Sequence, residues 1–423
     1  MICLDRANII EGMKRLQAYK FRIEPNGEQQ RAMRRIAGTC RFVWNKALAL
    51  QIANHQRGQK FVEHFDMCKW LPVWKKEPET LWLKETPSQL YQVVLKDLVR
   101  AYKNFFEKRA AFPTFKKKSA GTSFCFPQGC ELDAVNRRIR FPKLGWLSYR
   151  KSRAVEGTIK NIIVSCMAGK WYASIQTERE VAQPVHSATS IVGIDLGVTR
   201  FATLSDGTVF EPVNALGKHA ETLAKHQRCL SRKTKFSSNW KKQKQKISRV
   251  HHRVAHTRHD FLHKTSTLIS KNHAMIVIED LKVTNMSKSA KGTVEAPGRC
   301  VKAKSGLNKS ILDQAWGEFR RQLEYKQAWR GGELLTIDPR NTSRMCPACR
   351  HIAAENRKTQ AKFECVECGF AENADLTAAI NILRAGHARL ACQVNGAIMP
   401  SATGTHRSDL PRPEVEAVGI PVL

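Results

Sequence analysis

The chain has 423 residues, of which 42% are hydrophobic, enough to build folded cores in an expected two to four domains. Lys and Arg number 71 against 37 Asp and Glu, a formal net charge of +34, which predicts a polyanionic partner, nucleic acid, bound in a steeply salt-dependent way. No apolar run approaches the roughly 20 residues needed to cross a bilayer, and the start lacks the apolar core of a signal peptide. These features exclude a membrane protein and make the cytoplasm the expected location.

The first 180 residues predict a β module interrupted by a helical insertion. Residues 14–24 alternate as a strand, residues 28–110 keep mostly helical spacing, and residues 137–178 are typical of short strands. Met13 offers a second plausible start, so residues 1–12 are expected to be an upstream extension.

A basic and aromatic segment follows the predicted insertion. The stretch FPTFKKKSAGTSFCFP is expected to form a loop in which three lysines lie among four aromatic rings: Lys116, Lys117 and Lys118 beside Phe112, Phe115, Phe124 and Phe126. Lysines interleaved with aromatic side chains suit nucleic acid, whose phosphates and bases they can bind together.

A linker at residues 179–190 separates this module from a second half that opens on the buried strand IVGIDLG and two further short strands. Residues 217–264 then hold fourteen Lys and Arg, two acids and seven of the fourteen His of the chain. This composition predicts two basic helices, joined near residues 235–239, that contact phosphates. A solvated pair of charged helices is the alternative.

The remaining elements alternate between strands and helices. HAMIVIEDL predicts a buried strand, residues 287–306 a mobile loop, residues 310–330 a helix and ELLTID another strand. The tail after Gly386 is rich in Ala, Pro, Ser and His and is expected to be disordered.

Three acids stand out in this half. Asp195 lies in an otherwise apolar strand and Glu279 ends another, where a buried carboxylate is costly unless it is paired or binds a metal. Asp280 is a rival to Glu279, although strand alternation would turn the two to opposite faces. Asp375 precedes a short apolar helix, and considered alone it is better interpreted as the N-cap of that helix.

Carboxylates gathered in a strongly basic protein predict a cation site for phosphodiester chemistry. Two divalent ions about 3.5–4 Å apart can activate water and stabilise a leaving oxygen. Mg²⁺ prefers hard oxygen ligands and retains waters, so three carboxylates suffice for such a site.

The cysteines predict a separate metal site. Their odd total of 13 argues against a disulfide framework. Two CxxC pairs fifteen residues apart are typical of a structural zinc site with the ligands Cys346, Cys349, Cys365 and Cys368. By contrast, His251, His252 and His256 have no acidic neighbour and are expected to face solvent or RNA.

Taken together, these motifs resemble one family. GIDLGVTRFATLSDG, the basic helices, IVIEDLKVTNM and DPRNTSRMCPACRHI…FECVECGF…NADLTAAINILRAG are similar to TnpB, the nuclease encoded by bacterial insertion sequences and a relative of type V CRISPR effectors. The resemblance also takes in KRLQAYKFRIEPNGEQQRAMRRIAGTCRFVWNKAL and FPTFKKKSAGTSF, and it runs in order over residues 13–386.

The resemblance implies a multidomain α/β fold: an N-terminal WED-like β-barrel with a helical recognition insertion, then an RNase H-like RuvC domain with a zinc-ribbon insertion. The implied boundaries are 1–28 for the extension and first WED strand, 29–112 for the recognition insertion, 113–182 for the remaining barrel, 183–190 for the linker, 191–340 for RuvC with its basic pair 217–264, 341–372 for the zinc-binding insertion, 373–388 for the last RuvC helix and 389–423 for a disordered tail.

The resemblance also implies roles for individual residues. Asp195, Glu279 and Asp375 match the catalytic acids that hold two Mg²⁺, which displaces the N-cap interpretation of Asp375, and the four cysteines match the ligands of one structural Zn²⁺. Arg350 stands where a glycine commonly follows the first CxxC, and is expected to alter that turn. The residues expected to bind nucleic acid are Arg232, Lys233, Lys235, Lys241, Lys242, Lys244, Lys246, Lys116, Lys117 and Lys118.

The implied function is an RNA-guided, magnesium-dependent DNA endonuclease of a transposable element. Its expected partners are a guide RNA from the element end and target double-stranded DNA carrying a short adjacent motif. The alternatives are a guided DNA-binding regulator with little catalytic activity, a transposition accessory protein and a small CRISPR-associated effector.

Overall fold

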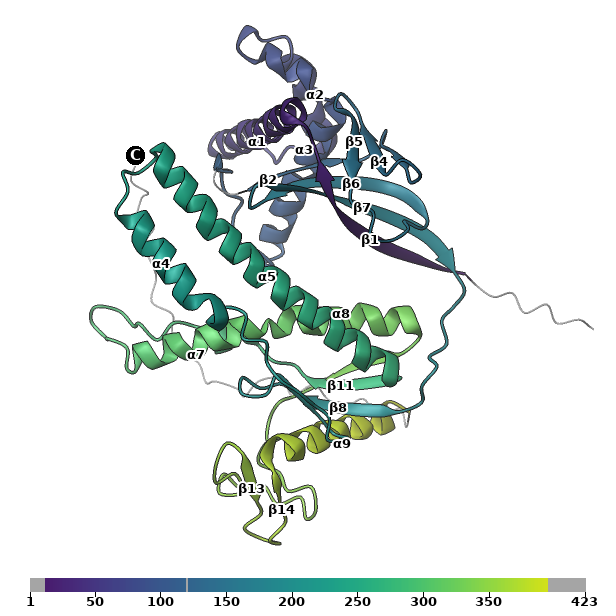
Figure 1. The fold of residues 1–423 in the computed structure, drawn as a ribbon, viewed down its shortest axis with the longest axis vertical. Coiled ribbons are helices and arrows are strands. Elements are labelled where there is room, and N and C mark those ends of the chain that lie inside the picture. The colour runs from purple at the N-terminus through teal and green to yellow at the C-terminus, as the bar shows by residue number, and fades with distance from the viewer. Residues whose placement is uncertain (1–11, 119–120, 395–423) are drawn as a thin grey trace, which may run out of the picture. The chain divides into compact units, whose positions relative to one another are not determined.

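The computed structural model describes residues 12–118 and 121–394, and these fall into two units (Figure 1). The first comprises the described residues up to Thr189 together with 212–274 and 283–333, and the second comprises 190–211, 275–282 and the described residues from Leu334 onward. Within these described ranges, no helix is long and apolar enough to cross a membrane. The expected upstream extension lies almost wholly outside the described residues.

A seven-stranded antiparallel sheet forms one part of the first unit. Its strand order is β2-β6-β7-β1-β5-β4-β3, and β1 pairs with β7 along almost its whole length, from Met13 opposite Val181 to Ile23 opposite Trp171. The bounds are β1 Met13–Glu24, β2 Thr122–Phe126, β3 Glu131–Asp133, β4 Arg138–Phe141, β5 Gly145–Tyr149, β6 Thr158–Met167 and β7 Lys170–Val181. Alternation along β1 buries Tyr19, Phe21 and Ile23, which is why a half-polar sequence forms a strand here.

Helices inserted between β1 and β2 share one hydrophobic core with this sheet. They are α1 (Gly27–Gln56), α2 (His64–Trp74), the 3-10 helix η1 (Pro78–Glu85) and α3 (Ser88–Phe106). A capping box starts α1: the Asn26 side chain accepts from the Gln29 amide at 2.8 Å, and the Gln29 side chain accepts from the Asn26 amide at 3.1 Å. On α3, apolar side chains at helical spacing from Leu90 to Tyr102 face the core.

The first unit also contains the basic helix pair. The helices are η3 (Gly217–His219), α4 (Ala220–Ser231), α5 (Ser238–Asn272), α6 (Val283–Met286), α7 (Val301–Gln314) and α8 (Trp316–Arg330). The predicted helix at 310–330 is therefore two helices, because Ala315 adopts a left-handed conformation (φ 55°) between α7 and α8. The expected loop at 287–306 is also shorter than predicted, since α7 begins at Val301.

The second unit is built on a five-stranded sheet of order β10-β9-β8-β11-β12. The bounds are β8 Ile191–Asp195, β9 Ala202–Leu204, β10 Val209–Phe210, β11 Met275–Glu279 and β12 Glu333–Ile337, while β13 (Lys362–Glu364) and β14 (Ala371–Asn373) form a separate hairpin. β8 and β11 run parallel in register, from Ile191 opposite Met275 to Ile194 opposite Ile278. Parallel central strands are buried on both faces, which explains their continuous apolar runs.

Helix α9 (Ala374–Val394) packs against this sheet (Figure 1), and two glycines permit the close approach. A Cβ on Gly193 would lie 2.3 Å from the Ala379 carbonyl oxygen, and one on Gly386 would lie 2.5 Å from the Val277 side chain. Gly386 thus marks a contact with β11 and not the end of the helix, which extends six residues past the predicted boundary at 388. The rest of the predicted tail, residues 395–423, lies outside the described residues.

Candidate functional site

The three acids singled out in the sequence lie in the second unit. Asp195 is the last residue of β8 and Glu279 the last residue of β11. Because these strands are parallel neighbours whose preceding residues pair, both carboxylates lie at the same edge of the sheet. Asp375 is in the first turn of α9, the helix that packs on β8 and β11.

Asp195 is close enough to Glu279 and Asp375 for their charges to act on its carboxylate. Burial, and after it the negative charges of Glu279 and Asp375, raise the pKa of Asp195 to about 7. Burial also raises the pKa of Glu279, although the Thr342 hydroxyl, which donates to Glu279 at 2.6 Å, opposes the rise. The structure therefore brings the three predicted acids together in one cluster of negative charge.

The helix cap belongs to Asn373 and not to Asp375. The Asn373 side-chain oxygen accepts from the backbone amides of Asp375 at 3.1 Å and Leu376 at 3.3 Å. This N-cap satisfies the first turn of α9 and leaves the carboxylate of Asp375 available. The interpretation that the residue pattern alone had favoured for Asp375 is wrong.

Asp280, the rival to Glu279, is engaged elsewhere. Its carboxylate forms an ion pair with Lys282, and its backbone amide donates to the Ile337 carbonyl at 2.9 Å. Glu279 meets Thr342 and not Lys282, as alternation along a strand requires.

Two arginines that the sequence analysis did not single out lie beside the acids. Arg357 is 3.7 Å from one oxygen of Asp375, and its charge lowers the pKa of Asp195 against the effect of burial. Arg200 is 4.0 Å from the other oxygen of Asp375 and donates to the Asn373 side chain at 3.3 Å. The cluster of acids is thus lined on one side by guanidinium groups, which can offset its charge or bind a phosphate.

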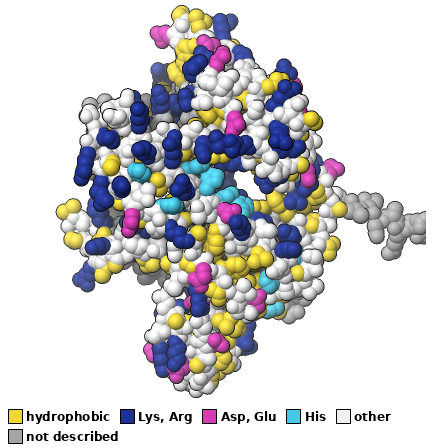
Figure 2. Space-filling view, viewed as in Figure 1, with side chains coloured by type: hydrophobic (Ala, Val, Ile, Leu, Met, Phe, Trp, Pro, Cys, Tyr) yellow, Lys and Arg dark blue, Asp and Glu magenta, His cyan; other side chains and the backbone are white. Residues whose placement is uncertain are grey.

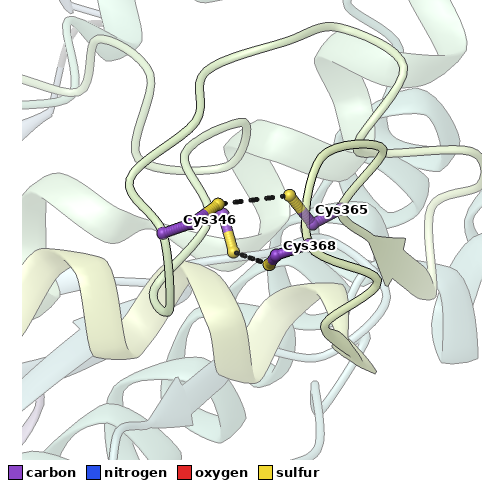
Figure 3. A group of neighbouring side chains, drawn as sticks. Cys346, Cys365 and Cys368 are labelled. Atoms are coloured by element: carbon purple, nitrogen blue, oxygen red, sulfur yellow. Dashed lines mark hydrogen bonds between the residues drawn. The ribbon is translucent and has the colours of Figure 1, made fainter.

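The four predicted cysteine ligands form the second part of the site (Figure 3). Their sulfur atoms all lie within 4.8 Å of one another, and Cys346–Cys368 and Cys349–Cys365 are each separated by 3.6 Å. Four ligands about 2.3 Å from a central tetrahedral zinc would be about 3.8 Å apart, so the cluster is compatible with zinc. Four thiolates would leave no open position on the ion.

Both CxxC turns have the same backbone geometry. The amide of Arg350 donates to the Cys346 carbonyl at 3.0 Å, and that of Gly369 donates to the Cys365 carbonyl at 3.0 Å. Both residues are left-handed, with φ of 66° and 72°. The expected change of turn at Arg350 does not occur, and the arginine instead accepts a conformation that costs a side-chain-bearing residue about 1–2 kcal/mol.

Buried asparagines connect the cysteine cluster to the acids. Asn356, which precedes Arg357, donates to the carbonyls of Arg344 at 2.9 Å and His351 at 3.1 Å and accepts from Val366 at 3.0 Å. Asn381 of α9 donates to the Thr342 carbonyl at 2.8 Å and the Met345 carbonyl at 2.7 Å. The loops that present Arg357 and Thr342 are therefore held by the same segment that carries the cysteines.

The predicted nucleic-acid ligands on the basic helices lie mostly at the surface. In Figure 2, Lys and Arg side chains gather over α4 and α5. Gln243 holds the two helices together, donating to the His226 backbone carbonyl at 3.1 Å, and Lys244 lies 5.1 Å from the centre of the Trp240 ring. The exposed residues of the predicted set here are Arg232, Lys235, Lys241, Lys242, Lys244 and Lys246, and Lys233 is half-buried.

The basic and aromatic segment differs from the expected loop. Phe124 and Phe126 lie on β2 and are buried in the core of the sheet, while Phe112 and Phe115 are exposed. The Lys116 amine lies 3.6 Å from the centre of the Trp44 ring on α1, a cation–π contact. Lys117 and Lys118 are exposed.

The histidines of α5 also correct an expectation. His252 shares a hydrogen bond of 3.0 Å with the Tyr172 hydroxyl of β7, and burial lowers its pKa. It helps to attach α5 to the sheet and is half-buried. His251 and His256 are exposed, as expected.

The raised pKa of Asp195 predicts how stability changes with pH in magnesium-free buffer. From about pH 4 to 7 the unfolded chain loses this proton while the folded chain retains it, so the free energy of unfolding falls as pH rises. The free energy of unfolding of Asp195→Asn should be close to that of the parent at pH 4 and about 1–2 kcal/mol higher at pH 7.5. This gain is smaller than the ~4 kcal/mol that the full pKa shift of Asp195 would give without solvent screening. Denaturant titrations at both pH values measure this, with Asp206→Asn as control. Equal stability of Asp195→Asn and the parent at pH 7.5 would contradict it.

Comparison with known proteins gives sequence matches over most of the chain. Residues 174–290 match a family described as "Probable transposase" (OrfB of IS605), residues 316–382 a "Cas12f1-like, TNB domain" and residues 13–60 a "Helix-turn-helix domain". The chain is 60% identical over 380 residues to the Escherichia coli (strain K12) protein named "Putative RNA-guided DNA endonuclease InsQ", covering 90% of this chain and 94% of that one. It is 33% identical to a Streptomyces pristinaespiralis protein of the same general name, covering 96% and 98%.

Solved structures also resemble the chain. One is described as "Cryo-EM structure of the Cas12f1-sgRNA-target DNA complex", with a TM-score of 0.33 and 16% identity, covering 87% of this chain and 99% of that one. Another is described as "Cryo-EM structure of CasPhi-2 (Cas12j) bound to crRNA", with a TM-score of 0.38 and 11% identity, covering 88% and 98%.

Proposed function

Because this chain belongs to the TnpB family of insertion-sequence proteins, we propose that it is an RNA-guided, magnesium-dependent DNA endonuclease of a transposable element, which cleaves DNA next to a short motif. The observation that carries the proposal is that Asp195 and Glu279 end adjacent parallel strands at the same edge of the five-stranded sheet, close enough to Asp375 for both other carboxylates to act on Asp195. Relatives named as RNA-guided DNA endonucleases support the choice of substrate.

We assign the two units to the domains of this family. The five-stranded sheet with α9 corresponds to the RNase H-like RuvC domain, and residues 341–372 to its zinc-binding insertion. The seven-stranded sheet corresponds to the WED-like barrel, with α1 to α3 as its recognition insertion. Mixed parallel pairing, with acids at the carboxyl ends of adjacent strands, supports the RuvC assignment.

In this proposal Asp195, Glu279 and Asp375 hold two Mg²⁺. When bound, the ions supply an activated water and stabilisation of the leaving oxygen. The chain itself positions the ligands: Thr342 fixes the orientation of the Glu279 carboxylate, and Asn373 caps α9 so that Asp375 is free to act as a ligand. Arg200 and Arg357, beside Asp375, are placed to bind a phosphate oxygen of the DNA strand.

The cysteine cluster has a structural role in the proposal. With one Zn²⁺ bound to all four thiolates, it would fix the loop that carries Arg357 and the start of α9. The basic helices would bind the guide RNA and its duplex with target DNA. Because base pairing with the guide RNA recognises the target sequence, the protein itself needs mainly to bind backbone phosphates. A net charge of +34 suits that role.

The test is to purify the chain with its co-expressed flanking RNA, sequence that RNA, and supply a plasmid library with randomised bases beside the guide match. The expected result is magnesium-dependent cleavage of plasmids that share a short motif, lost when the RNA is removed. Binding of the same plasmids without cleavage would favour the guided DNA-binding regulator, and strand-joining products would favour the transposition accessory protein.

A further inference from the structure

An aromatic pocket lies in the helical insertion, far in sequence from the acids, and Phe112 alone of its lining belongs to the basic and aromatic segment expected to contact nucleic acid. Its cavity is about 320 Å³. It is lined mainly by five rings: Phe61, Tyr102, Phe105, Phe106 and Phe112. Aromatic side chains this exposed are unusual for an ordinary core, because Phe106 is 60% and Phe112 43% exposed.

The pocket is preformed. The buried Gln51 side chain of α1 donates to the Val62 carbonyl at 2.6 Å and accepts from the Val62 amide at 3.2 Å, which fixes the loop that presents Phe61. Phe61 packs on Tyr102 with ring centres 5.0 Å apart, and Phe112 meets Tyr102 edge-on at 5.5 Å. A site that needs no reorganisation on binding loses little affinity to ordering costs.

The pocket has the size of a small-ligand site. A volume near 320 Å³ is at the lower end of the range of small-molecule pockets, about 300–1,000 Å³, and is too small for a helix. The edge-to-face contacts of Phe112 with Phe105 and Tyr102, at interplanar angles of 87° and 88°, do not stack ring on ring. Offset stacking with an incoming ring therefore remains possible for the exposed aromatic side chains.

The charge around the pocket identifies the occupant. Lys60 and His55 line it, and Lys103, Lys108 and Arg109 follow along the exposed end of α3 and the residues after it. Of the acids near these cations in sequence, Glu107 is ion-paired with Arg109 and Asp97 with Arg100, while Glu63 is exposed two residues after Phe61. An aromatic pocket with cations beside it complements a nucleotide, whose base can stack while its phosphate contacts the cations.

Resting on the proposed function, we infer that this pocket binds an unpaired base of the guide RNA by stacking. RNA is favoured over DNA because the single-stranded loops of a guide RNA present splayed bases to aromatic side chains before any target is bound, whereas target DNA becomes single-stranded only after it pairs with the guide. The pocket would thus bind a defined part of the RNA without reading the target.

The experiment uses the full-length chain, freed of RNA at high salt, and a 12-nucleotide single-stranded RNA with 2-aminopurine at its centre, whose fluorescence falls on stacking. In about 0.5 M NaCl, where phosphate contacts are weakened, the parent should quench the probe. Phe106→Ser and Phe106→Leu should weaken RNA binding about 5- to 50-fold and abolish the quench. Phe106→Tyr, which keeps an aromatic ring, should retain the affinity and the quench of the parent. Phe65→Ser is the matched control, because Phe65 is 82% exposed on α2 of the same insertion and outside the pocket.

Each other outcome has a distinct meaning. If Phe106→Leu behaves like the parent, the pocket accepts apolar groups in general and the stacking inference is wrong. If the DNA version of the probe is quenched as strongly, the choice of RNA is wrong. Thermal melting checks that Phe106→Ser remains folded. Because the readout does not involve cleavage, cleavage without quenching defeats this inference alone, and quenching without guided cleavage defeats the proposed nuclease alone.

Discussion

Glu279→Gln should lower the rate of guided DNA cleavage at least about 1,000-fold, while Asp280→Asn should leave the rate within about threefold. The two acids are consecutive in the sequence, and each substitution replaces a carboxylate by an amide of the same length. They differ in what they face: Glu279 lies in the acid cluster and accepts from Thr342, and Asp280 pairs with Lys282. A metal ligand contributes several kcal/mol to the transition state, whereas an exposed ion pair contributes about 0–1 kcal/mol.

The comparison needs RNA-loaded protein at equal concentration, with cleavage followed by single-turnover kinetics at saturating magnesium. RNA binding and target binding should be unchanged in both variants, since neither residue belongs to the basic helices. Equal loss of rate in both variants would show that this end of β11 is only structurally sensitive. Normal cleavage by Glu279→Gln would remove Glu279 from the metal site.

The strands and metal motifs were predictable because their signals are local. An apolar run ending in a carboxylate identifies β8 and β11, and two CxxC pairs at fixed spacing identify the cysteine cluster. Physical reasoning alone misplaced Asp375, because Asn373, two residues earlier, is an equally good cap and the pattern does not say which of them accepts the hydrogen bonds.

Other features depend on contacts that a linear reading does not reveal. Thr342 reaches Glu279 across 63 positions, and nothing in its local sequence marks it. Gly386 resembled a helix end, yet it is required by the passage of α9 over Val277. The break between α7 and α8 falls on Ala315 and not on Gly317 two residues later, so helix propensity alone does not locate it.

Cys365→Ser should destabilise the second unit by about 3–5 kcal/mol and reduce cleavage at least about 100-fold, although Cys365 is not one of the proposed catalytic acids. Four thiolates suit zinc, and a hydroxyl is a poor replacement for one of them. Loss of the ion would loosen the segment in which Asn356 positions Arg357 and Asn381 positions Thr342. Cys229→Ser is the matched control, because Cys229 is exposed on α4 and belongs to no cysteine cluster.

Zinc content by mass spectrometry and thermal melting separate the structural effect from the catalytic one. Cys365→Ser should lose close to one zinc per chain and melt earlier, whereas Arg357→Gln should keep its zinc and melting temperature and still cleave about 10-fold more slowly. The second variant tests whether the cysteine module supports cleavage by delivering Arg357 to Asp375, 3.7 Å away. If Cys365→Ser retains full zinc and full activity, the cluster neither holds the ion nor supports the acids. If only Arg357→Gln has no effect, the module acts through α9 and Thr342 instead, because these are its other contacts with the acid cluster.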